Sequence, residues 1–388
     1  MPQQRVLFVS NGHGEAAIAA RLASELRHRV PDCQTDHLAL VGDKPSPPGF
    51  RDVGPRRAMP SGGLVAMVNL PALAGDIRAG FVALWSAQRR FLRQAGAEYA
   101  QVVAVGDVYA ALMARYAKRP LTFVGTAKSL YVAPYGPVER LVLRRAQDVF
   151  VRDEPTAEWL RARGVPAVAP GNVIVDLLDV GEPLPAPDPP MLALFPGSRH
   201  SAYADAVKLA AVARSVLAVR PEYSAVLSVA PTLSVAEVLR LLRNDGWDVR
   251  TDDEVFAFRA HAGDVVLHGC TGELAPLLRL ATIVVGQAGT GNEAAAAAGV
   301  PVVALAASER LGWYRMRQGR LLGEALRVVR DDVPTASAGV LELIDSPAVR
   351  QHMSAVGRER MGAPGGAAAI AEVLANRLER FDATALKT

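Results

Sequence analysis

Short apolar runs rich in branched residues alternate with longer segments of helical periodicity along most of the chain. In the first half the apolar runs cover residues 6–9, 101–105, 121–124 and 149–151, and helical spacing covers 16–29, 108–117 and 155–163. Parallel strands are buried on both faces and are joined by crossover helices, so they are apolar throughout. The alternation therefore predicts an α/β fold with doubly wound parallel sheets.

A proline-rich segment at residues 181–190 interrupts this alternation. Five prolines in ten residues do not fit the interior of a helix or strand, so a stiff linker is expected here. The pattern then restarts, with strands expected at 191–195, 224–229, 264–267, 282–285 and 301–303 and helices at 203–219 and 235–242. We expect two domains, 1–180 and 191–363, with ligands in the cleft between them at the carboxyl ends of the strands.

The composition fits two filled cores and excludes several classes of protein. The 388 residues are 50% hydrophobic and carry a net charge of +4, too small an excess for a protein that neutralises many nucleic-acid phosphates. Cys33 and Cys270 are too few for a disulfide framework or a cysteine zinc site, so a reducing compartment is expected. We expect no export signal, and glycine, asparagine and proline make 281–307 a poor spanning helix. We expect a soluble, cytoplasmic protein.

The first expected strand ends in a turn formed by Asn11, Gly12, His13, Gly14 and Glu15. Glycines let backbone N–H groups approach a ligand, and the start of the next helix favours an anion. The glycine spacing meets a relaxed dinucleotide fingerprint, but Glu15 would put a carboxylate where a pyrophosphate should lie. A tight turn or a substrate-side loop is the better interpretation. His13 is a candidate polar site residue, or it only caps the turn.

Asp107 directly follows the expected strand at 101–105 and a glycine. At the carboxyl end of a strand its carboxylate can face the cleft and accept a proton from a substrate hydroxyl. Alternatively Asp107 only caps the helix that follows. Spacing alone favours the cap.

The second half opens with a small-residue turn that ends in Gly197, Ser198 and Arg199. Small residues at a helix start, followed by a guanidinium, form a suitable cradle for a diphosphate. A proline-glycine turn with a surface arginine would look similar.

A longer glycine-rich turn follows the expected strand at 282–285 and contains Gly289, Thr290, Gly291, Asn292 and Glu293. Its backbone N–H groups and the helix start behind them suit phosphate, and Glu293 can accept the hydroxyls of a ribose. Alternatively, Glu293 only complements the helix dipole. Two such turns in one domain favour a nucleoside diphosphate as the ligand.

Several chemistries lack their sequence signatures. The chain has no P-loop motif, no His-Glu-x-x-His and no Gly-x-Ser-x-Gly. It also has no Asp-x-Asp pair to hold Mg²⁺ against a nucleotide-sugar diphosphate. We therefore expect no metal site, and the charge of a leaving diphosphate would be met by helix dipoles and Arg199.

Residues 73–93 have helical spacing with an apolar face edged by arginines. The apolar face consists of Leu73, Ile77, Phe81, Leu84, Trp85, Gln88 and Leu92. Such a helix suits an anionic membrane surface or a lipid acceptor. An ordinary amphipathic helix packed on its own domain is the favoured alternative.

These segments, in this order, resemble the lipid-A-disaccharide synthases and, more closely, the lipid-A-disaccharide synthase-related proteins. The residues that carry the resemblance lie at 10–15, 105–107, 195–199 and 286–293, with 131–134 and 170–176 as connecting segments. The resemblance implies the GT-B glycosyltransferase fold, with two Rossmann-like domains facing across a cleft. The C-terminal half would bind a UDP-sugar, the N-terminal half would bind the acceptor, and a final helix within 364–388 would return to the N-terminal domain.

The resemblance also implies roles for single residues. Asp107 matches the family's catalytic carboxylate, which reverses the preference for a simple cap, Arg199 matches the arginine of the family's Pro-Gly-Ser-Arg turn, and Glu293 falls at the ribose. The first turn departs from the family, because the synthases have a Gly-Glu-x-Ser-Gly-Asp-like sequence where this chain has 11–15. A lipid A precursor as acceptor is therefore not implied.

The leading hypothesis is an inverting, metal-independent glycosyltransferase without a cofactor. Asp107, helped by His13, would deprotonate a lipid-linked or glycolipid acceptor, and the donor would be a UDP-sugar of the N-acetylglucosamine type. Such an enzyme would act in the cytoplasm or on the inner face of the cytoplasmic membrane. Alternatives are a UDP-sugar 2-epimerase or hydrolase, a nucleotide-binding protein without catalysis, and a dinucleotide-dependent oxidoreductase.

Overall fold

The computed structural model describes residues 4–43, 45–59, 70–126, 128–179, 190–251, 255–272, 274–306 and 313–385. The chain divides into two compact units, which we call unit 1 (Met1–Asp176 with Ala363–Thr388) and unit 2 (Leu177–Gly362). Unit 2 begins earlier than the expected linker, because the short 3-10 helix Leu177–Asp179 contacts a helix of unit 2. The proline-rich segment lies outside the described residues, except for Pro190.

Unit 1 is built on a seven-stranded sheet in the order β3-β2-β1-β4-β5-β6-β7, and every described pair in it is parallel. The strands are β1 (Arg5–Ser10), β2 (Gln34–Ala39), β3 (Arg51–Asp52), β4 (Gln101–Gly106), β5 (Leu121–Gly125), β6 (Asp148–Val151) and β7 (Ala167–Val168). Strands β1, β4 and β5 are apolar and buried over nearly their whole length, as strands covered on both faces must be. The predicted doubly wound α/β architecture is confirmed.

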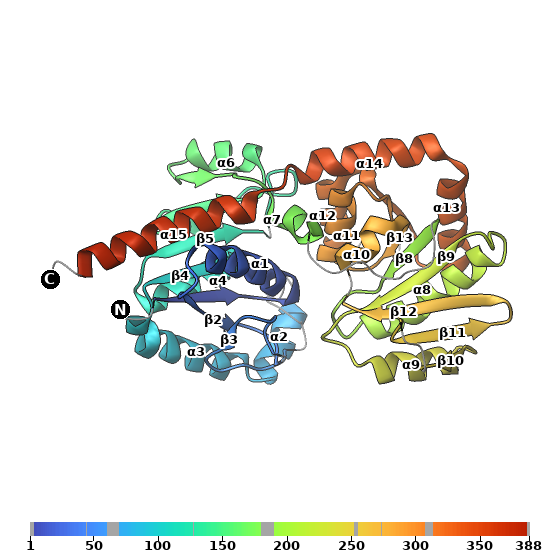
Figure 1. Cartoon of the computed structure of the whole chain (residues 1–388), viewed down its shortest axis with the longest axis horizontal. Coiled ribbons are helices and arrows are strands. Elements are labelled where there is room, and N and C mark those ends of the chain that lie inside the picture. The colour runs from blue at the N-terminus through green and yellow to red at the C-terminus, as the bar shows by residue number, and fades with distance from the viewer. Residues whose placement is uncertain are drawn as a thin grey trace. The chain divides into compact units, whose positions relative to one another are not determined.

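Helices cover both faces of this sheet (Figure 1). They are α1 (His13–Arg29), α2 (Leu70–Arg78), α3 (Phe81–Ala95), α4 (Val108–Ala114), α5 (Pro137–Leu143), α6 (Glu154–Arg161), α7 (Val173–Asp176) and α15 (Gly366–Ala385). The C-terminal helix α15 packs along α1, at the opposite end of the sequence. Both Asp176 carboxylate oxygens hold its start, accepting the N–H of Gly365 at 2.5 Å and of Ala367 at 2.7 Å.

The segment expected as one helix at 73–93 is two helices, α2 and α3, so that prediction was wrong. The chain breaks at Gly80, whose φ of 96° is left-handed, and Arg57 donates to the Ala79 carbonyl at 3.0 Å beside the break. In α3 the apolar face is turned inward, with Leu84 and Leu92 buried, whereas Ile77 of α2 is 48% exposed. This packing favours the ordinary amphipathic interpretation.

Unit 2 contains an eight-stranded sheet in the order β10-β11-β12-β9-β8-β13-β14-β15. Its strands are β8 (Met191–Phe195), β9 (Ser224–Val229), β10 (Asp248–Arg250), β11 (Phe258–Ala262), β12 (Val265–Thr271), β13 (Ala281–Gly286), β14 (Val302–Ala306) and β15 (Leu326–Arg330). Pairing is parallel from β12 to β15 and antiparallel within β10-β11-β12. The antiparallel edge was not expected from the sequence.

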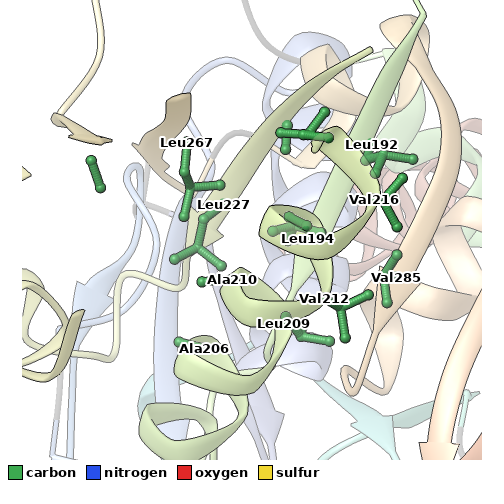
Figure 2. Close-up of a cluster of buried hydrophobic side chains, with 14 of the residues drawn as sticks. Leu192, Leu194, Ala206, Leu209, Ala210, Val212, Val216, Leu227, Leu267 and Val285 are labelled. Carbon is green, nitrogen blue, oxygen red and sulfur yellow. The ribbon is translucent and has the colours of Figure 1, made fainter. Parts of the chain in front are cut away.

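The core of unit 2 lies between its sheet and α8, α9 and α13. The helices of the unit are α8 (Ala202–Leu217), α9 (Val235–Asn244), α10 (Leu274–Leu280), α11 (Thr290–Ala298), α12 (Trp313–Leu322), α13 (Val333–Asp345) and α14 (Pro347–Met361). Figure 2 shows the buried face of α8, where Leu209, Val212 and Val216 lie close to strand residues such as Leu194 and Val285. This cluster fixes α8, and with it the turn that precedes the helix, against the sheet.

No helix among the described residues is both long enough and apolar enough to cross a membrane.

Candidate functional site

Each sheet has one point where the chain turns from one side of the sheet to the other. In unit 1 this point lies between β1 and β4, and in unit 2 it lies between β8 and β13. In open α/β sheets, ligands bind outside the carboxyl ends of the strands at such switch points. The sequence candidates Asn11 and Asp107 follow β1 and β4, whereas the turns at 197–199 and 287–293 follow β8 and β13. The fold therefore brings the candidates together in two groups, one in each unit.

In unit 1, Asn11 and Asp107 are in direct contact. Asn11 Nδ2 donates to Asp107 Oδ2 at 3.2 Å, and the other carboxylate oxygen of Asp107 accepts the backbone N–H of Ala110 at 3.1 Å. Asp107 is therefore the N-cap of α4, as the simpler interpretation expected. Asn11 is 7% exposed, and its Oδ1 has no hydrogen-bond partner among the described residues.

Asp107 has an unusual electrostatic environment for a capping residue. Burial raises the pKa of its carboxyl group above the ordinary value, and the hydrogen bonds from Ala110, Asn11 and the Tyr109 backbone oppose this shift only in part. The charge of Glu139 acts in the same direction as burial. A carboxylate with a raised pKa is a stronger base than an ordinary aspartate, so the cap and the base interpretations are compatible.

Glu15, in the first turn of α1, lies against the glycines of both strand ends. A Cβ atom at Gly12 would be 2.5 Å from Glu15 Oε2, and one at Gly106 would be 2.8 Å from Glu15 Cγ. Gly106 also has a φ of 120°, which other residues rarely adopt. These two glycines make room for the Glu15 side chain at the adjacent ends of β1 and β4. Gly14 is half-buried in the same first turn, and the helix begins at His13, whose side chain lies outside the described part of the chain.

A buried histidine, His37, contacts the end of β1 next to this turn, and the sequence did not predict it. Ser10, the last residue of β1, contacts His37 Nε2 at 2.8 Å through its hydroxyl, and His37 Nδ1 is hydrogen-bonded to the Ser46 hydroxyl. Burial lowers the pKa of His37 to about 4, so the ring is neutral at neutral pH. A neutral ring has one donor and one acceptor nitrogen, which suits two hydroxyl partners.

In unit 2 the two candidate turns are neighbours. Strands β8 and β13 pair so that Phe195 lies opposite Gly286, and the N–H groups of Gln287 and Ala288 both donate to the Phe195 carbonyl, at 2.8 and 3.2 Å. Gly197 has a φ of 106°, and a Cβ atom there would lie 3.7 Å from the Ala288 Cα. The small residues thus allow both loops to leave the sheet side by side.

The residues expected at the donor differ in accessibility. Gly197, Ser198, Gly289, Thr290, Gly291 and Glu293 are half-buried, and Arg199 is exposed. The Ser198 carbonyl accepts the Thr232 hydroxyl at 3.0 Å, which ties the first turn to the loop after β9. Glu293 lies in the first turn of α11. These positions are compatible with contact to a ligand.

Asn292 is fully buried, so its side chain does not reach a ligand. Its Nδ2 donates to the Gly286 carbonyl at 3.0 Å and to Gln318 Oε1 at 3.3 Å. A Cβ atom at Gly286 would lie 2.0 Å from Asn292 Oδ1. The structure therefore changes the expected role of Asn292 from ligand contact to support of the turn. The sequence pattern missed this, because a buried and an exposed asparagine look alike in a glycine-rich turn.

Among the described residues, no cluster of three or more His, Cys, Asp or Glu side chains is placed to hold a metal ion. Cys33 and Cys270 are both buried, and they form no disulfide in the part of the chain that the structure describes.

Comparison with known proteins shows which solved structures share the fold. No protein-family model and no curated protein matches the chain. Among solved structures it is similar to S. aureus MnaA in a co-structure with UDP (TM-score 0.60, 13% identity, 97% of each chain covered). It is also similar to a putative UDP-N-acetylglucosamine 2-epimerase from Listeria monocytogenes (0.57, 16%, 98% of this chain and 97% of that one). A UDP-glucosyltransferase from Polygonum tinctorium gives 0.57 at 12% identity, with 97% and 99% covered.

These identities are low, so the likeness establishes the fold rather than a reaction. The similar structures span nearly the whole chain, and they include both epimerases and glycosyltransferases. None of them points specifically to lipid-A-disaccharide synthases. The chain has the GT-B fold, with a Rossmann-like sheet in each unit that is parallel except at the β10-β11-β12 edge of unit 2.

Proposed function

We propose that this protein is an inverting, metal-independent glycosyltransferase that transfers a sugar from a UDP-sugar to a hydroxyl group of a lipid-linked or glycolipid acceptor. The observation that carries the proposal is the Asp107 carboxylate at the switch point of unit 1, with its raised pKa and its hydrogen bond from Asn11. This is the environment that a general base at a strand end requires.

In the proposed reaction Asp107 accepts the proton of the acceptor hydroxyl. The hydroxyl oxygen of the acceptor attacks the anomeric carbon of the donor at the same time. The bond from that carbon to UDP breaks in the same displacement, so the configuration at the carbon inverts. UDP leaves with its negative charge stabilised by the starts of α8 and α11 and by Arg199. His13 is the second candidate for proton transfer, since it begins α1 beside the same turn.

The UDP-sugar donor is supported by the two adjacent small-residue turns of unit 2 and by the UDP and UDP-sugar ligands named for the similar structures. An N-acetylglucosamine-type sugar and a lipid-linked acceptor rest on the sequence resemblance. Contact between residues 73–93 and a membrane surface remains a prediction, weakened by the inward-facing stripe of α3.

A UDP-sugar 2-epimerase is the second candidate. Two observations favour it: Glu15 and Asp107 follow the adjacent strands β1 and β4 at one switch point, and several similar structures are UDP-N-acetylglucosamine 2-epimerases. Removing a proton from one face of a sugar carbon and returning one to the other face needs two acid–base groups, whereas transfer needs one base.

The test follows the fate of UDP-N-acetylglucosamine with and without a monosaccharide glycolipid in detergent. For a transferase, UDP release and labelled glycolipid should both depend on the acceptor. Formation of the 2-epimer without acceptor would identify the epimerase instead. A thermal-shift series with UDP, GDP, dTDP, CMP and NAD should single out UDP, because a ligand at about 100 times its dissociation constant stabilises by roughly 2.7 kcal/mol. Stabilisation by NAD alone would contradict both candidates.

A further inference from the structure

Helix α12 carries two polar side chains that are buried although no sequence motif marks them. Arg315 is 8% exposed and Gln318 is 5% exposed. They lie three positions apart, so they share one face of the helix. Burying a guanidinium group is costly unless its donors are satisfied, so the partners of this pair indicate what it is for.

Those partners belong to the glycine-rich turn after β13. The fork of Arg315 spans two amides, donating from one nitrogen to Gln287 Oε1 and from another to Gln318 Oε1. Gln318 Nε2 then donates to the carbonyls of Ala288 at 3.1 Å and Gly289 at 3.4 Å. The side chain of Gln318 thus connects the guanidinium to the backbone of the turn.

The direction of these hydrogen bonds determines where the N–H groups on the other side of the turn point. In a trans peptide unit the carbonyl and the following N–H point in opposite directions. With the carbonyls of Ala288 and Gly289 held toward Gln318, the N–H groups of Gly289 and Thr290 are aimed away from α12. The first N–H groups of a helix have no partner within the helix, and they are the groups that bind a phosphate.

The positive charge of Arg315 also acts on the neighbouring turn. It lowers the pKa of Asp205 in the first turn of α8, although burial keeps that pKa raised overall. Lys208 lowers the pKa of Asp205 in the same way, and Asp331 raises it. The charge of the guanidinium therefore acts at the start of α8, through Asp205, and lies beside the turn before α11, through the hydrogen bond to Gln287.

We propose that Arg315 and Gln318 are positioning residues for the donor diphosphate, which hold the glycine-rich turn with its N–H groups ready and add a positive charge behind it. This inference rests on the proposed UDP-sugar donor. It assigns a role to α12 that does not require either side chain to touch the ligand, and it makes diphosphate binding, rather than nucleoside binding, depend on them.

The experiment measures the affinities of UDP and uridine by calorimetry for the wild type, Arg315→Lys, Arg315→Met and Gln318→Glu. Lysine keeps the charge but cannot reproduce a fork that reaches two amide oxygens. Glutamate at 318 keeps acceptors for Arg315 but loses the donor to the turn. We expect UDP affinity to fall about tenfold in Arg315→Lys and in Gln318→Glu and further in Arg315→Met, with uridine affinity unchanged.

Gln88→Glu is the matched control. Gln88 is also buried and donates to three backbone carbonyls, those of Ala39, Leu40 and Pro55, but it lies in unit 1. This variant should lose thermal stability and keep its affinity for UDP. Equal loss of UDP and uridine affinity in the α12 variants, or unchanged UDP affinity, would overturn the positioning role while leaving the proposed function standing. Failure of the wild type to bind UDP would overturn both.

Discussion

The candidate site of unit 1 and that of unit 2 occupy the same place in their sheets, yet they are made of different chemistry. At the switch point of unit 1 the side chains are carboxylates and a buried amide, namely Asp107, Glu15 and Asn11. At the switch point of unit 2 the turn is formed by small residues and is held by Gln318 and Arg315. The unit 1 site carries carboxylates, one of them with a raised pKa, whereas the unit 2 site presents backbone donors with a permanent positive charge behind them.

The difference indicates how the same doubly wound sheet can serve two purposes. A proton acceptor needs partial burial, so unit 1 places Asp107 where burial raises its pKa. The proposed diphosphate site needs backbone N–H groups held in one direction, and unit 2 buries amides and a guanidinium behind the glycines of its turn. Variants in unit 1 should therefore change turnover, and variants in unit 2 should change the binding of UDP.

The largest expected effect is that of Asp107→Asn. Asparagine keeps an oxygen for the Ala110 N–H, and a flip of the Asn11 amide can restore the second hydrogen bond, so the fold should be preserved. The base is lost, and turnover should fall by about 10²- to 10⁴-fold with UDP affinity unchanged. Initial rates and calorimetric titration measure the two effects.

Asp153→Asn is the control for the capping role of Asp107. Asp153 follows β6 of the same sheet and caps α6 in the same way, accepting the Thr156 N–H at 2.9 Å. The Asp153→Asn variant should lose at most about 1 kcal/mol of stability and keep the turnover of the wild type. If both variants lost activity equally, Asp107 would be a cap and not a base.

His37 should make the stability of unit 1 sensitive to acid. Its pKa falls from 6.5 to about 4 on folding, so the unfolded chain binds the proton more readily between these values. Stability is then fully present above pH 6.5 and decreases as the pH falls toward 4, by about 3 kcal/mol at 1.36 kcal/mol per unit. Urea unfolding of the wild type and His37→Gln between pH 4 and 7 measures the difference. A variant with the same pH dependence as the wild type would exclude His37 as its source.

Two glycine-to-alanine variants compare the units directly. Gly286→Ala places a methyl group 2.0 Å from the buried Asn292 amide oxygen, and Gly106→Ala meets Glu15 Cγ at 2.8 Å with an unfavourable φ. Each should cost about 1–3 kcal/mol of stability. Gly286→Ala should weaken UDP binding, whereas Gly106→Ala should reduce turnover and leave UDP binding intact. The reverse outcome would break the assignment of binding to unit 2 and chemistry to unit 1.

The sequence predicted the apolar part of the fold well, since the expected strands at 101–105 and 191–195 lie within β4 and β8. It missed β2, because this strand buries Asp36 and His37 and does not look apolar. Asp36 is stable there only through Arg5, Arg51 and Tyr99, which donate to it from elsewhere in the unit. Such pairing depends on tertiary structure and leaves no periodic pattern.

The candidate site, like the fold, was predictable where it follows apolar strands and not where it depends on tertiary contacts. Residues that follow apolar strands directly, such as Asn11 and Asp107, were found because strand ends meet at one edge of a parallel sheet. Arg315 and Gln318 were missed, because they act from α12 through contacts with a turn about thirty residues earlier in the chain. The signal available in the sequence is an arginine and a glutamine three residues apart, a spacing that exposed helices also show.

The smallest expected effect separates the two interpretations of Glu293. If its carboxylate accepts a ribose hydroxyl, the wild type should prefer UDP over 2′-deoxy-UDP, and Glu293→Gln should reduce that preference several-fold. If Glu293 only complements the dipole of α11, the variant should lose about 0.3–1 kcal/mol of stability and bind both nucleotides with an unchanged ratio. Calorimetric titration of the two nucleotides against both proteins gives this ratio. A preference that disappears in the variant would show that the contrast between the units is incomplete, because a carboxylate would then recognise the ligand in unit 2 as well.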